Sequence, residues 1–461
     1  MKKLIFAFLG VFGLCAFAWG EYNEMKIPSS QEIRSRITGS WLMAPLSSLR
    51  NKSDEIIVNN VGTRFQVRLE ENDRDFAIVL APETKMDMEL RNGDSVRTVK
   101  AQIYPKGAAG SWVLYRNKKT EESTKIEWYF NPDSDVHIEF RPMKNKTYVD
   151  LVVFGSYLAR SVPVGVPFTK LYSASFQDVR RWTKTSLPWD KIQVVPGQYR
   201  DSLYMVSVIK ENLGNFEYDP STCYDEKGQL IDIFTGLPYT RKDDEGKDYV
   251  PELKNIHLLS GAGFVKWIVD GIVEPATGRG TKLKDLTSPT IDYSQTGKTG
   301  VMSQDWNLFF TLDWVRNLGA KAMEIRTRRD VTFETGGIDV IHNYFVSDLI
   351  DGKLVSSVGY IKNTGYSTDR IKSMLYVLAV TEPSWFFLGA IRQPSAQKPD
   401  EIVFNDCAVF FPYFDDKGRF GCFVFEKGEV MSIEKFISRH KGSFVHLERI
   451  KATQIFFPYK K

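Results

Sequence analysis

Two stretches of alternating sequence, KIEWYF at residues 125–130 and VHIEF at residues 136–140, decide the fold class of the N-terminal half. In both, an apolar side chain occupies every second position and a more polar one lies between. Successive side chains of a strand point to opposite faces, so this pattern predicts antiparallel strands with one buried face. The turn sequence Asn131-Pro132-Asp133 lies between the two stretches and predicts a tight connection between neighbouring strands.

The same period of two extends outward from these strands, from about Arg64 to Phe154. Turn sequences at residues 92–94, 106–107 and 144–145 divide it into short strands, and no useful helical period lies between Gly62 and Pro167. Strands at this spacing are typical of a sandwich or barrel. We therefore expect residues 19–195 to form an antiparallel β-sandwich-like domain.

A proline-containing junction from about Ser161 to Gly197 is expected to end this domain. Its two tryptophans, Trp182 and Trp189, could stack on sugar rings. Tryptophan more often anchors buried surface, so we expect this pair to pack inside the protein.

The second half of the chain changes period. Apolar residues three and four apart predict helices that begin at Asp201 or Ser202, at Ser260 and at Ser303. The predicted ends of these helices are Gly214, Pro275 and Gly319, and a shorter helix is expected near residues 369–375. Strand-like segments follow at residues 376–380, 385–391, 402–411, 420–425 and 444–450. Helices followed by an antiparallel sheet predict an α+β domain for residues 196–461.

The first 18 residues have the pattern of a signal peptide. Lys2 and Lys3 precede an apolar run, and Ala16-Phe17-Ala18 places small residues at a cleavage site. The apolar run is shorter than the ~20 residues of a membrane-spanning helix. We expect cleavage after Ala18, export to the periplasm or cell envelope, and no integral membrane segment afterwards. An uncleaved anchor and a lipoprotein with Cys15 lipidated are the alternatives.

Composition excludes several classes of function. Of 461 residues, 61 are basic and 57 acidic, and the two charges are interleaved. A nucleic-acid partner is not expected, because a binding surface for it needs a basic stripe. The histidines lack metal-ligand spacing with a cysteine or a second histidine, so no metal site and no cofactor are predicted.

The segment SGAGFVKW at residues 260–267 resembles the nucleophile motif of the NlpC-type cell-wall cysteine peptidases. In that papain-like family an Asp-Cys-Ser-Gly-Phe-Val-x-Trp segment opens a helix, whose N-terminus stabilises a thiolate. Here the glycine, phenylalanine, valine and tryptophan match, at Gly263, Phe264, Val265 and Trp267. Ser260 stands at the aspartate position, and Gly261 at the cysteine position, followed by Ala262.

The family's catalytic base is a histidine on the first long strand of the following sheet. The matching segment here is Val403–Val409, where Asn405, Asp406 or Cys407 stands in its place. The resemblance thus implies a papain-like helix-plus-antiparallel-sheet domain that is catalytically degenerate, and so a pseudoenzyme. It implies binding of a peptidoglycan peptide or of an envelope protein partner. The expected groove is lined by Gly261, Ala262, Gly263 and Cys407.

The resemblance also implies a geometry. Gly261 or Ala262 should lie beside residues 405–407, and Trp267 and Trp306 should lie in the core behind them. A glycine at position 261 is expected to leave room for a ligand backbone.

Two alternatives remain open. One is an active cysteine hydrolase or transpeptidase whose nucleophile has moved to Cys407 or Cys223. The other is a purely structural envelope protein. A disulfide between Cys407 and Cys422 is conceivable across one hairpin, but two buried thiols are expected instead.

Overall fold

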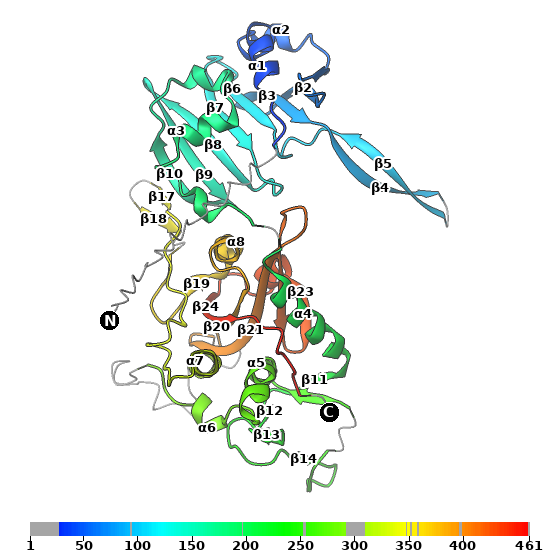
Figure 1. The fold of residues 1–461 in the computed structure, drawn as a ribbon, viewed down its shortest axis with the longest axis vertical. Helices are drawn as coiled ribbons and strands as arrows, with labels where there is room; N and C mark the ends of the chain where they lie inside the picture. Colours follow the sequence, from blue (N-terminus) through cyan, green and yellow to red (C-terminus); the bar gives the residue numbers. More distant parts are fainter. Residues whose placement is uncertain are drawn as a thin grey trace, which may run out of the picture.

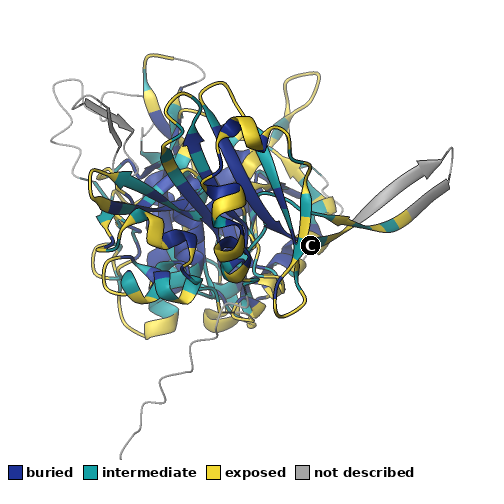
Figure 2. Cartoon of the chain, turned by 90° about the horizontal axis from the view of Figure 1, so that it is seen from above, coloured by how far each residue is buried: buried dark blue, intermediate teal, exposed yellow. Residues whose placement is uncertain are grey.

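The computed structural model describes residues 27–92, 95–195, 197–251, 255–291, 309–346, 348–350, 353–356, 359–395 and 399–459, without the side chains of residues 87–97 and 347–358. Two large antiparallel sheets, one in each half of the chain, are joined through helices (Figure 1). The mixed α+β class predicted from the sequence is therefore confirmed. Figure 2 shows that the buried residues lie mainly in the strands and helices of the body, whereas many connecting loops are exposed.

The first sheet has eight strands in the order β1-β2-β3-β6-β7-β8-β9-β10, so each strand pairs with the next strand of that sheet along the chain. Strands β4 and β5 form a separate hairpin that projects from the body (Figure 1). The bounds are β1 (Glu55–Val58), β2 (Arg64–Glu71), β3 (Asp75–Pro82), β4 (Thr84–Asn92), β5 (Ser95–Ile103), β6 (Trp112–Asn117), β7 (Ser123–Tyr129), β8 (Val136–Met143), β9 (Lys146–Val153) and β10 (Ser156–Pro163).

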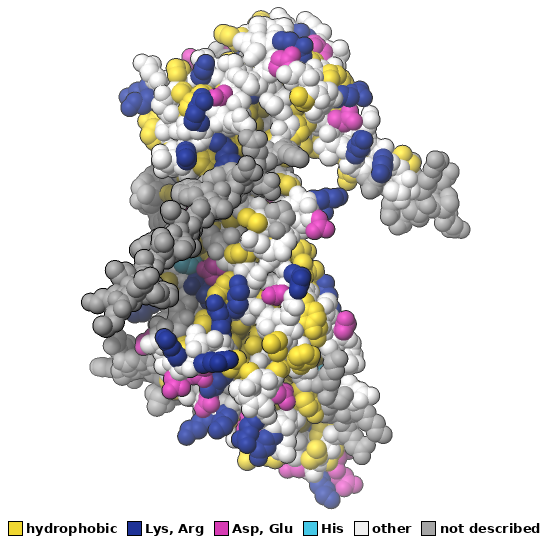
Figure 3. Space-filling view, in the orientation of Figure 1, with side chains coloured by type: hydrophobic (Ala, Val, Ile, Leu, Met, Phe, Trp, Pro, Cys, Tyr) yellow, Lys and Arg dark blue, Asp and Glu magenta, His cyan; other side chains and the backbone are white. Residues whose placement is uncertain are grey.

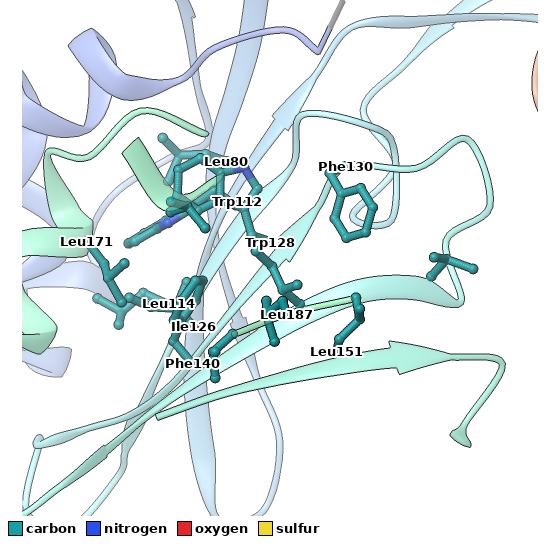
Figure 4. Close-up of a cluster of buried hydrophobic side chains, with 14 of the residues drawn as sticks. Leu80, Trp112, Leu114, Ile126, Trp128, Phe130, Phe140, Leu151, Leu171 and Leu187 are labelled. Atoms are coloured by element: carbon teal, nitrogen blue, oxygen red, sulfur yellow. The ribbon is translucent and has the colours of Figure 1, made fainter. Parts of the chain in front are cut away.

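Short helical segments cover the apolar face of this sheet. They come from both sides of it in the sequence: α1 (Gln31–Ile37), η1 (Thr38–Leu42), α2 (Leu46–Leu49), η2 (Phe168–Tyr172), α3 (Phe176–Trp182) and η3 (Trp189–Lys191). Figure 4 shows the core of this layer, where Trp112, Trp128 and Phe140 lie near Leu171 and Leu187. The prediction of a sandwich is wrong, because this sheet packs against helices and not against a second sheet.

Trp189 belongs to the same core. It is 6% exposed, and its indole Nε1 donates a hydrogen bond to Thr183 Oγ1 at 3.1 Å. Trp182 is partly buried against the same cluster. The expected packing role is confirmed for Trp189, whose ring is not available for a sugar.

The second large sheet has the strand order β19-β24-β20-β21-β22-β23. Helices α5 and α7 pack on one face, and α8 and α9 pack on the other. The bounds are α5 (Gly261–Thr277), α7 (Phe310–Thr327), β19 (Tyr366–Ser367), η7 (Thr368–Arg370), α8 (Ile371–Thr381), β20 (Trp385–Pro394), β21 (Ile402–Phe414), β22 (Phe420–Glu426), β23 (Glu429–Ser432), α9 (Ile433–Arg439) and β24 (Phe444–Lys451).

Smaller elements surround this sheet. Strand β11 pairs in parallel with β16, while β12–β13, β14–β15 and β17–β18 are antiparallel pairs. The bounds are α4 (Arg200–Asn212), η4 (Leu213–Asn215), β11 (Phe216–Tyr218), β12 (Thr222–Tyr224), β13 (Leu230–Asp232), β14 (Arg241–Lys242), β15 (Asp248–Tyr249), β16 (His257–Leu259), α6 (Leu283–Leu286), β17 (Asp348–Ile350) and β18 (Lys353–Ser356).

Helix α8 joins the two halves. Tyr376 and Val377 pack into the core of the first sheet, whereas Leu375 and Leu378 pack into the core of the second. Tyr376 Oη also accepts a hydrogen bond from Asn131 Nδ2 at 2.8 Å. The predicted strand at residues 376–380 is therefore wrong. A helix buried on both sides is apolar all round, which removes the helical period from its sequence.

The predicted end of α7 and the predicted start of α4 are also wrong. Helix α7 runs through Gly319 to Thr327, because this glycine serves close packing: a Cβ there would lie 2.6 Å from Ile338 Cγ2. Residue Tyr199, not Asp201 or Ser202, precedes the first turn of α4. Residues Ser303 and Trp306 lie outside the described part of the chain.

Helix α5 passes through Pro275, where the sequence predicted its end. Proline has no N–H, so the carbonyl of Gly271 lacks its helical donor. The backbone N–H of Phe457 supplies that hydrogen bond at 2.9 Å, and Trp267 Nε1 donates to the carbonyl of Tyr459 at 2.9 Å. The C-terminal segment thus supplies the hydrogen-bond donor that the helix itself lacks at Pro275.

Gly271 permits this docking, since a Cβ there would lie 2.6 Å from Phe456 Cε2. We expect Gly271→Ala to lower the free energy of unfolding by about 1–3 kcal/mol, the usual cost of overpacking. Urea unfolding of the full chain measures this.

The matched control is Gly214→Ala, where a Cβ meets nothing within 4 Å. This control should change stability by no more than about 0.5 kcal/mol. Equal stability of the two variants would contradict the packing role of Gly271.

Candidate functional site

The site that the sequence singles out begins at the N-terminus of α5. Ser260 caps the helix: its Oγ accepts a hydrogen bond from the backbone N–H of Gly263 at 2.9 Å. The backbone N–H of Ser260 donates to the carbonyl of Thr222 on β12, also at 2.9 Å. The predicted start of this helix at Ser260 is confirmed, and β12 fixes it in place.

Gly263 is required by this arrangement. A Cβ at position 263 would collide with the carbonyl oxygen of Thr222 and lie 3.1 Å from Cys223 Cα. The glycine therefore allows α5 to lie directly against the backbone of β12.

The start of α5 also faces β21, as expected. A Cβ on Gly261 would lie 3.1 Å from Asp406 Oδ1 and 3.6 Å from Lys427 Cγ. The predicted closeness of Gly261 to residues 405–407 is thus confirmed for Asp406. The space that a glycine leaves is occupied here by Asp406 and Lys427.

Asp406 and Lys427 form an ion pair with Oδ2 and Nζ 2.5 Å apart. The other carboxylate oxygen of Asp406 accepts a hydrogen bond from the backbone N–H of Cys407 at 3.0 Å. The Lys427 side chain is 34% exposed and the Asp406 side chain 7%, so the lysine forms the outer member of the pair. The Lys427 ammonium lies 5.5 Å from the ring centroid of Tyr218, which is itself half exposed.

Burial and mutual attraction oppose each other in this pair. Burial raises the pKa of Asp406 above its usual value, although Lys427 opposes the shift. Burial lowers the pKa of Lys427, but the charge of Asp406 and the hydrogen bond to it outweigh burial and leave the pKa raised. The lysine is therefore charged at neutral pH and faces solvent with part of its side chain.

Of the other predicted site residues, Asn405 is exposed and its Oδ1 accepts a hydrogen bond from Gln393 Nε2 at 3.2 Å. The carbonyl of Ala262 accepts a hydrogen bond from Trp314 Nε1 at 3.0 Å. Trp267 is 2% exposed and lies in the core behind the start of α5. Cys407 is also fully buried in that core, so its thiol packs against apolar side chains.

All three described cysteines are buried and free. Burial raises the pKa of Cys223 to about 12 and holds the pKa of Cys407 and Cys422 well above the ordinary thiol value. A thiol in such surroundings stays protonated and unreactive at neutral pH. Cys407 and Cys422 belong to the cores on opposite faces of the sheet, which explains why no disulfide joins them.

Sequence analysis missed Lys427, although the hairpin β21–β22 contains a signal for it. Val409 pairs with Phe425 in that hairpin, and counting two residues further in each direction brings Cys407 opposite Lys427. Strands at residues 402–411 and 420–425 were predicted, so the register of a hairpin between them could have placed Lys427 beside Asp406.

Two clusters among the described residues combine one histidine with two carboxylates: Glu127–His137–Glu139 and Asp339–His446–Glu448. Each already contains a cationic side chain. Lys125 Nζ lies 2.6 Å from Glu127 Oε1, and Arg316 NH2 lies 2.6 Å from Asp339 Oδ2. In each cluster a cation therefore already occupies one of the two carboxylates, and a divalent metal ion would have to displace that cation.

The buried cluster makes stability depend on pH. His446 Nδ1 lies 2.6 Å from Glu448 Oε1, and both residues are 0% exposed. Burial holds the pKa of His446 well below 6.5 and the pKa of Glu448 well above 4.5. In the folded protein the pair therefore keeps one proton over the neutral range, whichever atom carries it. Asp339, Arg316 and Tyr360 face the same ring.

We expect the stability advantage of the wild type over Glu448→Gln to shrink as the pH rises through the neutral range. At a pH between the ordinary pKa values of glutamate and histidine, the wild type binds one proton at this pair both when folded and when unfolded. The Glu448→Gln variant binds one proton at His446 only when unfolded. At a pH above the ordinary pKa of histidine, only the folded wild type still binds a proton at this pair. Its free energy of unfolding therefore falls as the pH rises. Urea unfolding at several pH values tests this, and a pH-independent difference would contradict it.

Comparison with known proteins gives one match. Residues 23–191 match a family described as a domain of unknown function (DUF8515). The matched segment contains the first sheet and the helical segments that cover it. No curated protein and no solved structure matches the chain.

Proposed function

We propose that residues 196–461 form a papain-like, NlpC-type binding module that holds a peptidoglycan peptide without cleaving it, in an exported protein of the cell envelope. The observation that carries this proposal is the Asp406–Lys427 ion pair beside Gly261 at the start of α5. In an active member of the family, a thiol and an imidazole would meet at this place. Here a carboxylate and an ammonium meet instead, so the site offers recognition without a nucleophile.

The chemistry of the pair favours an anionic peptide group. Lys427 presents a charged ammonium, and the positive end of the α5 dipole adds to the local potential. Asp406 neutralises one side of the ammonium and fixes its position. Peptides of the cell wall carry free carboxylates, and a charge-assisted hydrogen bond to one contributes about 1.5–3 kcal/mol.

The surroundings supply further contacts. Tyr218 is 49% exposed beside Lys427, and Asn405 is exposed on β21. An exposed aromatic ring next to a cation suits a ligand with peptide bonds and short side chains.

Export remains part of the proposal. The predicted signal peptide, residues 1–18, lies outside the described residues. In the part of the chain that the structure describes, no helix is both long and apolar enough to cross a membrane. On the face shown in Figure 3, basic and acidic side chains are interleaved over both halves.

Removal of Lys427 tests the site. We expect Lys427→Ala in the full chain to weaken binding to purified sacculi about tenfold or more, which corresponds to the loss of one charge-assisted hydrogen bond. Lys427→Arg should retain most of the binding because it keeps the cation. Co-sedimentation with sacculi over a range of protein concentrations measures these affinities.

The matched control is Lys417→Ala, which removes an exposed lysine from the turn between β21 and β22. It should bind like the wild type. If the folded wild type does not bind sacculi, the protein is better described as an envelope partner or a structural protein. If Lys427→Ala binds as well as Lys417→Ala, binding occurs elsewhere.

The alternative of an active cysteine enzyme has its own test. Because all described cysteines are buried with raised pKa values, we expect slow alkylation by iodoacetamide in the native protein and fast alkylation in urea. Mass spectrometry of tryptic peptides resolves the three sites. One fast-reacting native cysteine, at position 407 or 223, would favour the relocated nucleophile.

A further inference from the structure

A second candidate site lies near the opposite end of α5. A cavity of about 320 Å³ opens between the C-terminal half of α5, helix α7 and the end of β24. It begins near Ile272, which is roughly 16 Å along the helix from Gly261 at 1.5 Å per residue. It is therefore separate from the Asp406–Lys427 site.

The walls of this cavity are apolar. They include Ile272, Met323, Ile325 and Ile450, together with Ile455 from the segment after β24. Ile455 is 63% exposed. Large apolar side chains left exposed around a cavity are typical of a binding site for an apolar ligand.

Cationic side chains stand around the opening. Arg449 is already paired, with its Nε 3.1 Å from Glu382 Oε2. Arg326 and Lys451 form no ion pair with any carboxylate among the described residues. Both lie over one indole ring instead: the Arg326 guanidinium carbon is 4.9 Å and the Lys451 ammonium 5.4 Å from the ring centroid of Trp385.

Arg326 and Lys451 thus bring two like charges to the same indole ring. Burial and then the charge of Arg326 lower the pKa of Lys451, whereas the charges of Asp201 and Glu382 raise it, and Lys451 Nζ donates a hydrogen bond to the carbonyl of Pro383 at 3.1 Å. An anionic group at the opening of the cavity would find both cations in its lining.

We propose that this cavity binds a single-chain amphiphile with an anionic head group. The chain fills the apolar cavity between α5 and α7, and the head group lies between Arg326 and Lys451. Each buried methylene contributes about 0.8 kcal/mol, so the chain supplies affinity while the two cations select the charge of the head. This ligand site is independent of the peptide site proposed above.

The test is calorimetric titration of the full chain with three monomeric twelve-carbon probes: dodecanoate, dodecanol and dodecyltrimethylammonium. We expect dodecanoate to bind at least tenfold more tightly than dodecanol, and the cationic probe to bind most weakly. The double variant Arg326→Gln/Lys451→Gln should lose this preference for dodecanoate. The charge-matched control Arg329→Gln/Lys441→Gln should keep it, because neither residue lines the cavity.

A second variant separates cavity binding from surface adhesion. Ala322 lines the cavity and is 7% exposed, so Ala322→Met should fill it and weaken all three probes. The proposal is overturned if folded wild type does not bind dodecanoate, if dodecanol binds equally well, or if Ala322→Met binds unchanged. Binding to anionic lipid vesicles but not to monomeric dodecanoate would also overturn it, since that result indicates a membrane-surface patch.

Discussion

The close packing of α5 between β12, β21 and the C-terminal segment is the constraint on which the second half of the protein depends. The helix is held at two glycines: Gly263 lies against the backbone of Thr222, and Gly271 lies against the ring of Phe456. Between them Lys266 and Asp270 form a buried ion pair one turn apart, so even the polar side chains of the helix are satisfied internally. A helix fixed in this way cannot shift without losing the hydrogen bond from Ser260 N–H to the Thr222 carbonyl and the hydrogen bond from Phe457 N–H to the Gly271 carbonyl.

This fixed helix places two different environments at its two ends. Its N-terminus meets the Asp406–Lys427 pair, where charge is partly exposed and no thiolate is present. Its C-terminal half forms one wall of an apolar cavity whose opening carries two cations without carboxylate partners among the described residues. The proposals for a peptide and for an amphiphile follow from this difference in chemistry, and either can fail without the other.

Short-range sequence patterns correctly predicted the parts of the fold that depend on interactions between residues close in sequence. The alternation of apolar and polar residues predicted the strands around Trp128 and Ile138, and Ser260 as a capping residue predicted the start of α5. The wrong predictions involve partners that are distant in sequence. Pro275 did not end α5 because Phe457 donates to the freed carbonyl, and Gly319 did not end α7 because Ile338 needs the space. At the site, motif spacing placed Gly261 beside Asp406, whereas Lys427 required the register of a hairpin.

The most direct test is to observe Lys427 itself in the presence of a ligand. Reductive methylation with labelled formaldehyde gives each lysine an NMR signal, and Lys427→Arg identifies the signal of Lys427 by its disappearance. If a soluble peptidoglycan peptide binds at the start of α5, titration should shift the Lys427 signal selectively and leave the signal of Lys417 in place. A Lys427 signal that does not move, while the peptide binds or fails to bind, would contradict the proposed site.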